Sequence, residues 1–485
     1  MTRTLALALL CSVALSAPAS AANTTPQEAQ RLLQVFQTYL SPKPGVVTVT
    51  PQGSSYEVRL DPGPLLDLIT LPELELKFSP IAFGLEPLGG GRWHVTHTGA
   101  HEVKAEIANN MAVAVKFGRW HFDGEFDEAL MSFTRSEIEV TDFSLVEAIK
   151  VPGANGAVSQ TTAKMTSSLK GVSGTADALS MTTTSEQLET VGAYDVPFPG
   201  PDSRRIVSLK LAYRIGRATT ESQVTGLRNR AMYGLWAWLV AHPSAGEITA
   251  AQEEFRQKVR AFLPIFENIT GSGRYYDIQV DTQVGPFSVK EMTTAVSLTT
   301  SGPAGGIAER FSLTGLSLPQ GALPNWAGVL VPHDATVDFV ATGLDVAAMA
   351  AVAVDHFNLT ESPPLKPELE PQLMGALLPA QTLNITLKPT SFINALYALN
   401  LSGIMKGTPG RGGEGHAEIS LKGIDAVTAA LAAAPPEARM GQAVRMLSFA
   451  RTLAKPGADG ALTWVIDAAP TAGVKVNGVV VIPPH

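Results

Sequence analysis

The sequence predicts an α+β fold that is predominantly antiparallel β-sheet, in two related halves that each open with an amphipathic helix. Apolar and polar residues alternate with a period of two through most of the chain, and helical periodicity is confined to a few short segments. One strand pattern also occurs twice, at Tyr56–Asp61 and Tyr276–Asp281. Each copy reads aromatic, acidic, β-branched, polar, aliphatic, Asp, which predicts a duplication. An elongated arrangement of the halves is compatible with this pattern.

The length of the chain, 485 residues, exceeds the ~300 residues at which one hydrophobic core usually stops growing. We therefore expect at least two parts. The predicted division is a signal peptide at 1–22, a first half at 23–216 and a second half at 217–485, with a Pro-rich linker at 361–371.

The composition restricts the class of protein. Hydrophobic residues make up 45% of the chain and charged residues only 16%, which argues against disorder. The net charge of -8 and the absence of a long Lys or Arg run exclude nucleic acid as an expected partner. After the first residues, the longest apolar stretch, Val346–Val354, is too short to span a bilayer.

The first residues predict export. Arg3 precedes an apolar run from Leu5 to Leu15, and the small residues at 19–21 suit a signal peptidase. We expect a periplasmic protein. The single cysteine, Cys11, lies inside this segment, so the mature chain is expected to have no disulfide and no thiol chemistry.

The first half opens with a predicted helix at Thr25–Leu40, with Thr25 as N-cap and Glu28 completing a capping box. A hairpin and a meander of strands follow. The stretch at 151–190 is rich in Ser and Thr, which predicts either weak strands at a sheet edge or a mobile loop.

Two helices are predicted at the centre of the chain. The first has apolar residues at helical spacing from Leu227 to Leu239 and is expected to end at His242-Pro243. The second is expected to begin at a cap formed by Thr249 and Gln252. Strands then resume, a helix is predicted at 438–453, and Asn477-Gly478 predicts a closing hairpin.

A short cassette of the form apolar, polar, Gly, apolar recurs at irregular spacing. It predicts strand ends that bend at a bulge. Its glycines are Gly171, Gly226, Gly315, Gly343, Gly403 and Gly423.

The central helices supply the candidate ligand-binding residues. Aromatic side chains follow the arginines at 228 and 230, a pattern typical of a helix at a membrane surface. Core packing between helix and sheet explains the same stripe and is the favoured alternative. The candidates are Trp236, Trp238, Phe255, Phe262 and Phe266.

A metal site is weighed and not predicted. His94, His97, His101 and His121 are close in sequence, but His94 and His97 would point to opposite faces of a strand. His121, Asp123, Glu125 and Asp127 would share one face about 7 Å apart, and an exposed polar strand face is the favoured explanation. We expect no cofactor.

No catalytic motif occurs in the chain, neither a nucleophile elbow nor a His-Glu-x-x-His helix nor a phosphate loop. Our main hypothesis is a non-catalytic envelope protein that binds or shuttles a lipid or another amphipathic component and contacts the membrane peripherally. The alternatives are a periplasmic scaffold for protein partners and a hydrolase whose site is not visible in sequence.

In the duplicated strand, the Gly cassettes and the closing Val474–Gly478, the chain resembles uncharacterised exported β-rich proteins of proteobacteria, such as the YdgA-like group. The resemblance implies an envelope protein built of long sheets with interspersed helices. It implies no catalytic residues.

Overall fold

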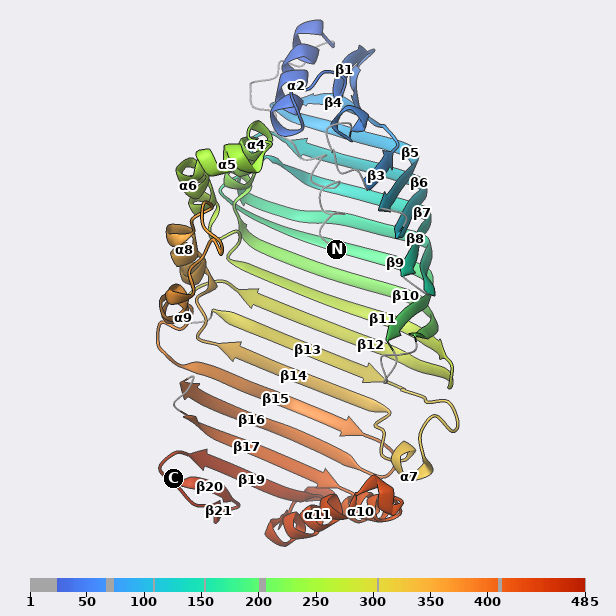
Figure 1. Ribbon diagram of the computed structural model, residues 1–485, viewed down its shortest axis with the longest axis vertical. Helices are drawn as coiled ribbons and strands as arrows, with labels where there is room; N and C mark the ends of the chain where they lie inside the picture. The colour runs from blue at the N-terminus through green and yellow to red at the C-terminus, as the bar shows by residue number, and fades with distance from the viewer. Residues whose placement is uncertain are drawn as a thin grey trace. The chain divides into compact units, whose positions relative to one another are not determined.

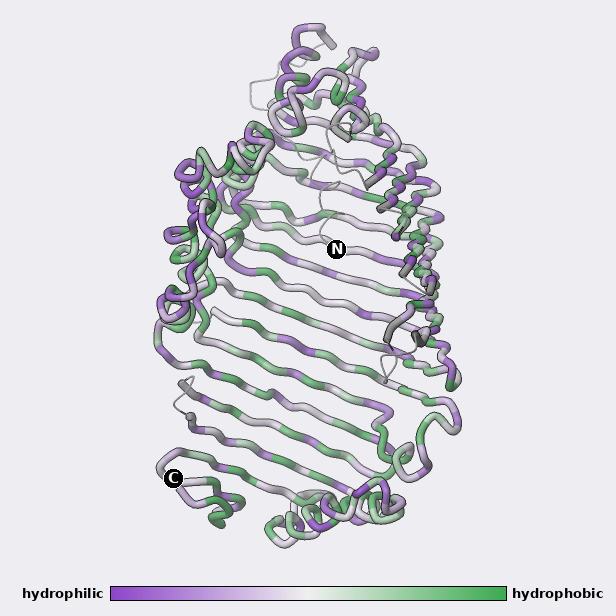
Figure 2. The backbone as a smooth tube through the Cα atoms, viewed as in Figure 1, coloured by the Kyte–Doolittle hydropathy of each residue, from purple (hydrophilic) through white to green (hydrophobic). Residues whose placement is uncertain are grey.

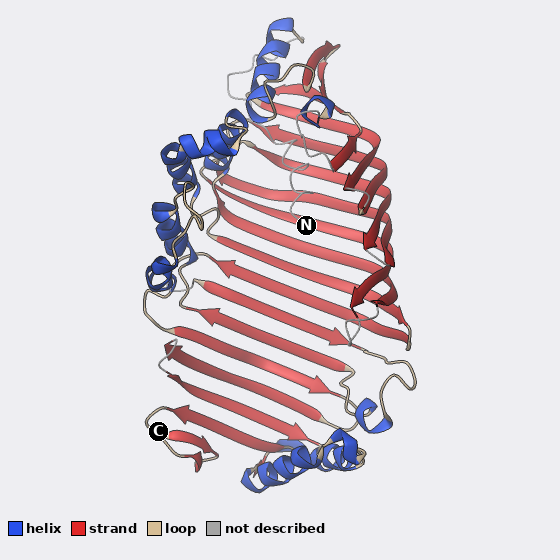
Figure 3. Cartoon of the chain, in the orientation of Figure 1, coloured by secondary structure: helices blue, strands red, loops and turns tan. Residues whose placement is uncertain are grey.

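A computed structural model describes residues 24–66, 74–107, 110–151, 154–199, 206–302, 305–408 and 412–484. The predicted signal peptide and Cys11 lie outside these residues. Strand predominates, and the strand pairs described below are antiparallel, which confirms this part of the predicted fold (Figure 1, Figure 3). The chain forms two compact units. Unit 1 ends at Ile269 and also contains Ala350–Leu369, whereas unit 2 contains Thr270–Met349 and the chain from Glu370 onward.

Unit 1 is built on a sheet in the order β1-β2-β4-β5-β6-β7-β8-β9-β10, with β3 paired to the later part of β5. Its strands are β1 (Val47–Gln52), β2 (Ser55–Leu60), β3 (Leu74–Phe78), β4 (Ile81–Gly89), β5 (Arg92–Ile107), β6 (Met111–Asp127), β7 (Ser132–Val151), β8 (Ala154–Thr175), β9 (Ala178–Pro199) and β10 (Ile206–Leu227). Its helices are α2 (Pro26–Tyr39), α3 (Gly63–Leu66), α4 (Asn229–Ala241), α5 (Ala245–Ala250), α6 (Gln252–Phe262) and η1 (Pro367–Leu369).

Unit 2 contains a sheet in the order β12-β13-β14-β15-β16-β17-β19-β20-β21, with β18 on β19. Its strands are β12 (Gly285–Thr299), β13 (Gly306–Thr314), β14 (Asp334–Thr342), β15 (Leu383–Ile393), β16 (Ala398–Thr408), β17 (Gly412–Lys422), β18 (Lys455–Pro456), β19 (Leu462–Ala469), β20 (Gly473–Val476) and β21 (Val479–Ile482). Its helices are α7 (Asn325–Gly328), α9 (Glu370–Leu377), α10 (Ile424–Ala432), η2 (Pro436–Ala438), α11 (Gly441–Leu453) and η3 (Ala458–Gly460). β11 (Asn268–Thr282) and α8 (Val346–His356) each contain residues of both units.

The predicted first helix is confirmed as α2, but its capping box is only half formed. Thr25 Oγ1 accepts a hydrogen bond from Glu28 N at 3.1 Å, as expected. The Thr25 N–H, however, donates to the Tyr56 hydroxyl at 2.9 Å, and the Glu28 carboxylate instead accepts from Arg31. A tertiary contact therefore replaces the local one.

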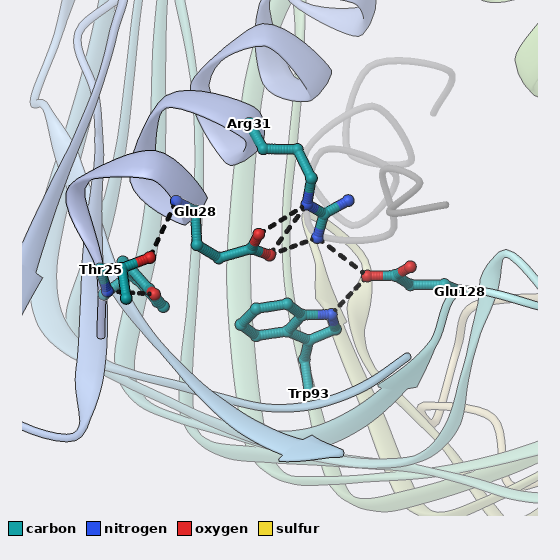
Figure 4. A network of polar contacts seen from close by, with 6 residues as sticks. Thr25, Glu28, Arg31, Trp93 and Glu128 are labelled. Atoms are coloured by element: carbon teal, nitrogen blue, oxygen red, sulfur yellow. Dashed lines mark hydrogen bonds and ion pairs between the residues drawn. The ribbon is translucent and has the colours of Figure 1, made fainter. Parts of the chain in front are cut away.

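Arg31 connects α2 to the sheet through a buried carboxylate (Figure 4). Its Nη2 lies 3.3 Å from Glu128 Oε1, and the same oxygen accepts from Trp93 Nε1 at 2.7 Å. The Glu128 side chain is only 5% exposed, so an unpaired charge at this position would be costly. Leu32 and Phe36 of α2 belong to the same buried apolar cluster as Val58, and this cluster is the core at this end of unit 1.

The long strands of unit 1 turn along one line. One residue in each of β6 to β10 is skipped by the ladder at matching register: Gly118, Asp142, Ala163, Glu189 and Gly216. Asp142 and Glu189 have positive φ angles of 55° and 52°. A Cβ on Gly118 would lie 2.6 Å from Asp142 Cβ, so only glycine fits there. Figures 1 and 3 show these strands turning at the right of the view.

The Ser/Thr-rich stretch at 151–190 is neither an edge nor a loop. It contributes β8 and β9, which lie between β7 and β10 inside the sheet of unit 1 and are 22 residues long each. Hydroxyl pairs join the strands, such as Thr162 with Thr190 at 3.1 Å. Because small β-branched and hydroxyl side chains fit a pleated surface, polarity here did not prevent pairing on both sides within the sheet.

The predicted cap of the second central helix is wrong. Helix α5 has Ser244 as its N-cap, which forms a complete capping box with Glu247, and α6 follows after a break at Ala251. The predicted boundary at 216/217 falls within β10, and the predicted linker at 361–371 includes the passage from unit 1 to unit 2 after Leu369. The division into halves stays a prediction.

The glycine cassettes do bend the chain. Five of the six glycines, all except Gly403, have φ between 62° and 96°, where a Cβ is strained. Gly423, for example, ends β17 and stands at the N-cap of α10. The closing hairpin is also confirmed, because Val476 pairs with Val479 across Asn477 and Gly478, both with positive φ.

We predict that Glu128→Ala lowers the free energy of unfolding by about 3 kcal/mol, because Arg31 and Trp93 lose a buried acceptor. Chemical denaturation followed by tryptophan fluorescence measures it. Glu75→Ala, which breaks an exposed pair with Lys77 at 2.7 Å, is the control and should change stability far less. Equal effects of the two substitutions would contradict the role of the network.

Candidate functional site

The candidate site is an apolar pocket in unit 2, with a volume of about 640 Å³. It lies between one face of the C-terminal strands and the helices α10 and α11. Ligand sites commonly measure about 300–1,000 Å³, so the pocket has the size of a small-molecule site.

The floor of the pocket is made by side chains that are neighbours across strands. Leu401 of β16 pairs with Ile419 of β17, which pairs with Trp464 of β19. A second row joins Leu399 to Leu421 in the same way. Side chains alternate between the two faces of a strand, so these rows lie on one side of the sheet. On the other side are polar residues such as Ser420, and the alternation can be followed along the strands in Figure 2.

The helices and the closing hairpin provide the walls. Val427 of α10 and five residues of α11 line the pocket, and Val476 and Val481 come from the hairpin. The residues of α11 are Met446, Leu447, Phe449, Ala450 and Leu453. At its deep end the pocket reaches the buried cluster of Leu421, Ile424 and Trp464.

The polar groups of the lining are already satisfied. None of the lining residues carries a charge. The Tyr397 hydroxyl donates to Leu330 O at 2.9 Å, and burial raises the pKa of Tyr397, which keeps the hydroxyl protonated. Trp464 Nε1 donates to Ala450 O at 2.7 Å. The pocket therefore offers apolar contact and no side-chain hydrogen bond to a ligand.

The aromatic residues predicted to bind a ligand belong to unit 1 and do not line this pocket. Trp238 is buried, and it stacks on His242 at a ring distance of 4.0 Å and on Phe255 at 5.5 Å. Phe255 meets Phe357 edge-on. These contacts are those of core packing, the alternative that the sequence favoured.

The other three candidates are less buried. Trp236 is 46% exposed, and its Nε1 donates to Tyr39 O at 2.7 Å. Phe262 is the last residue of α6 and Phe266 follows that helix, both half-buried. The structure does not test ligand binding by these five residues, so their binding role stays a prediction.

Residues 350–369 belong to unit 1 and contact helix α6. Arg256 donates to Val354 O at 3.1 Å and to Phe357 O at 2.9 Å, and its guanidinium lies 5.2 Å from the centre of the Phe357 ring. Arg260 pairs with Asp355. No local sequence pattern indicates this contact, because its partners are about a hundred residues apart.

The histidines separate into two groups, as strand alternation requires. His94 is half-buried and contacts Asp123 at 2.7 Å. His97 and His101 are buried, with their Nε2 atoms 2.8 Å apart, and both rings lie against Trp120 beside the line where the strands turn. Burial lowers the pKa of both histidines. This pair stabilises the turn of the sheet only while neutral.

The carboxylates weighed as metal ligands are occupied by protein groups. Asp123 and Glu125 pair with Arg135 at 3.0 and 2.9 Å, and Asp127 caps the turn at Ala129. The hydrogen bond from His94 lowers the pKa of Asp123. His121 contacts Thr98 at 2.9 Å. Within the described residues no group of three or more acidic, His or Cys side chains could hold a metal ion.

The sequence predicted strands and a helix at 438–453 in this part of the chain, but not the pocket that they form. The available signal was Met446 and Phe449, an apolar pair three residues apart on that helix. In the described part of the chain no helix is long and apolar enough to cross a membrane.

Comparison with protein-family models, with curated proteins and with solved structures finds no match to this chain.

We predict that the protein loses stability as the pH falls below ~6.5, the ordinary pKa of histidine in an unfolded chain. Folding favours the neutral forms of His97 and His101, so the unfolded chain binds more protons in that range and the folded state is disfavoured. Thermal unfolding at pH 7.5 and 5.5 measures the loss, which His101→Phe should reduce. His333→Phe, an exposed histidine, is the control. An unchanged loss in His101→Phe would disprove the role of the pair.

Proposed function

We propose that this protein is a non-catalytic, exported envelope protein that binds the hydrocarbon part of a lipid or a similar amphipathic component in the apolar pocket of unit 2. The observation that carries the proposal is the lining, which has no charge and whose two polar side-chain groups are bonded to backbone carbonyls. The N-terminal sequence pattern supports export to the periplasm.

The chemistry of the lining favours a hydrocarbon over a polar ligand. A polar group that entered the pocket would lose its water and find no partner, at a cost of about 1–3 kcal/mol. An alkyl chain would instead gain ~25 cal/mol for each Å² of apolar surface removed from water. A charged headgroup would stay outside the pocket, in contact with water.

We extend the proposal to the organisation of the chain. The repeated strand pattern in β2 and β11 supports two related halves in an α+β protein, and the style of the sequence supports kinship with the YdgA-like exported proteins. A scaffold for protein partners is the competing function, and the experiments below separate the two.

We expect the mature protein purified from its own envelope to carry a lipid. Native mass spectrometry would show a mass above that of the chain, and solvent extraction of the same sample would identify the lipid. A protein of bare mass that also fails to bind added fatty acid would overturn the proposal and favour the scaffold.

We predict that a brominated fatty acid quenches Trp464, which lines the pocket, in the wild type. The chain has six tryptophans, so the part of the quenching that disappears in Trp464→Phe is the part that comes from Trp464. Ala450→Phe should weaken binding about tenfold or more, because the larger ring occupies the volume of the ligand.

Ser448→Phe is the matched control, since residue 448 is an exposed position of the same helix outside the lining. Equal affinities of Ala450→Phe and Ser448→Phe would show that the fatty acid binds elsewhere.

A further inference from the structure

The pocket of unit 2 does not end at a polar rim. Two of its lining residues on α11 are also among the most exposed apolar side chains described, Met446 at 64% and Phe449 at 60%. Exposed apolar groups of this size carry a cost in water unless a partner covers them. The apolar lining thus continues outward from the pocket onto the surface of the helix.

The closing hairpin extends the same surface. Val481 lines the pocket, and Ile482 beside it is exposed. Val479 is exposed too, and it pairs with the lining residue Val476, so it lies on the same face of the hairpin. Two further exposed residues, Val329 and Leu396, directly precede the lining residues Leu330 and Tyr397. We call this set of exposed residues around the pocket the mouth: Val329, Leu396, Met446, Phe449, Val479 and Ile482.

The charge of this region is opposite to that of the protein. Residues 422–482 contain six Lys and Arg and four Asp and Glu, whereas the whole chain has a net charge of -8. Arg451 is paired with Asp425. Arg445 is exposed and directly precedes Met446, so a basic group stands beside the apolar mouth. This charge is complementary to an anionic surface.

We propose that the mouth docks onto the surface of an anionic lipid bilayer, so that an acyl chain passes from the bilayer into the pocket without crossing water. The inference rests on the proposed function. Met446, Phe449 and the hairpin residues Val479 and Ile482 enter the interface, and Arg445 contacts phosphate. This is the arrangement of peripheral helices with an apolar face and basic flanks. Docking explains why the pocket opens beside exposed apolar residues.

Co-sedimentation with vesicles of phosphatidylcholine, with and without phosphatidylglycerol, tests the inference on the full mature chain. We expect binding to the vesicles that contain phosphatidylglycerol. Val479→Ser/Ile482→Ser should weaken it about tenfold, through lost apolar burial. Arg445→Glu should weaken it at least fivefold on the anionic vesicles and make it less sensitive to salt.

Ile404→Ser/Met405→Ser is the matched control, since it removes two exposed apolar side chains of β16 that do not line the pocket. It should bind vesicles like the wild type. Equal weakening by this control and by the hairpin variant would overturn the inference, and so would binding that ignores lipid charge. A dimer or a protein complex that forms in place of vesicle binding, and that the hairpin substitutions abolish, would assign the mouth to a protein partner.

The quenching of Trp464 by a brominated fatty acid in buffer separates the two proposals. Quenching without vesicle binding refutes the docking surface and leaves the proposed function standing. Vesicle binding by both wild type and Ala450→Phe, without any quenching of Trp464, refutes the pocket as the lipid site. Transfer of the brominated lipid from vesicles to Trp464, slowed in the hairpin variant, is the result that the inference requires.

Discussion

The structure depends on the hydrogen-bonded ladder between long antiparallel strands. Each strand must pair its backbone groups with a neighbour, and once paired it presents successive side chains to opposite faces. In unit 1 the ladders run for up to 22 residues. With the backbone fixed in this way, the side chains decide only which face is apolar, and the long helices lie where strands end, as α4 does after β10 and α10 after β17.

A ladder of this length has to turn, and the turn decides where particular residues stand. The skipped positions across β6 to β10 place two residues in left-handed conformations and require a glycine where backbones approach. Beside these skipped positions, the pair of His97 and His101 is buried against Trp120. A short cluster of histidines that suggests a metal site in sequence is thus part of the packing at a bend.

The pocket of unit 2 follows from an imbalance between sheet and helices. The strands β16, β17 and β19 present rows of Leu, Ile and Trp to one side, and the helices α10 and α11 cover only part of that surface. Apolar surface left uncovered in this way is unfavourable in water, and a ligand with a hydrocarbon chain removes the cost. Met446 and Phe449 of α11 are likewise apolar side chains that no other part of the described chain covers fully.

The sequence by itself determined the local features of the protein. It predicted the predominance of antiparallel strands, a helix at Thr25–Leu40 that is observed as α2, the bends at the glycine cassettes and the turn at Asn477-Gly478. These features are set within a few residues by periodicity, capping and allowed φ angles. It also predicted that the side chains of His94 and His97 point to opposite faces of their strand.

Only the tertiary structure decided which strands are neighbours and what covers them. The Ser/Thr-rich stretch became two interior strands because pairing with β7 and β10 satisfies its backbone. Arg256 found its partners in residues 350–369, and Leu401, Ile419 and Trp464 met in one row from three strands. Such contacts join residues far apart in the chain. Their energy comes from burial and pairing that no local pattern encodes, and for that reason the pocket could not be predicted.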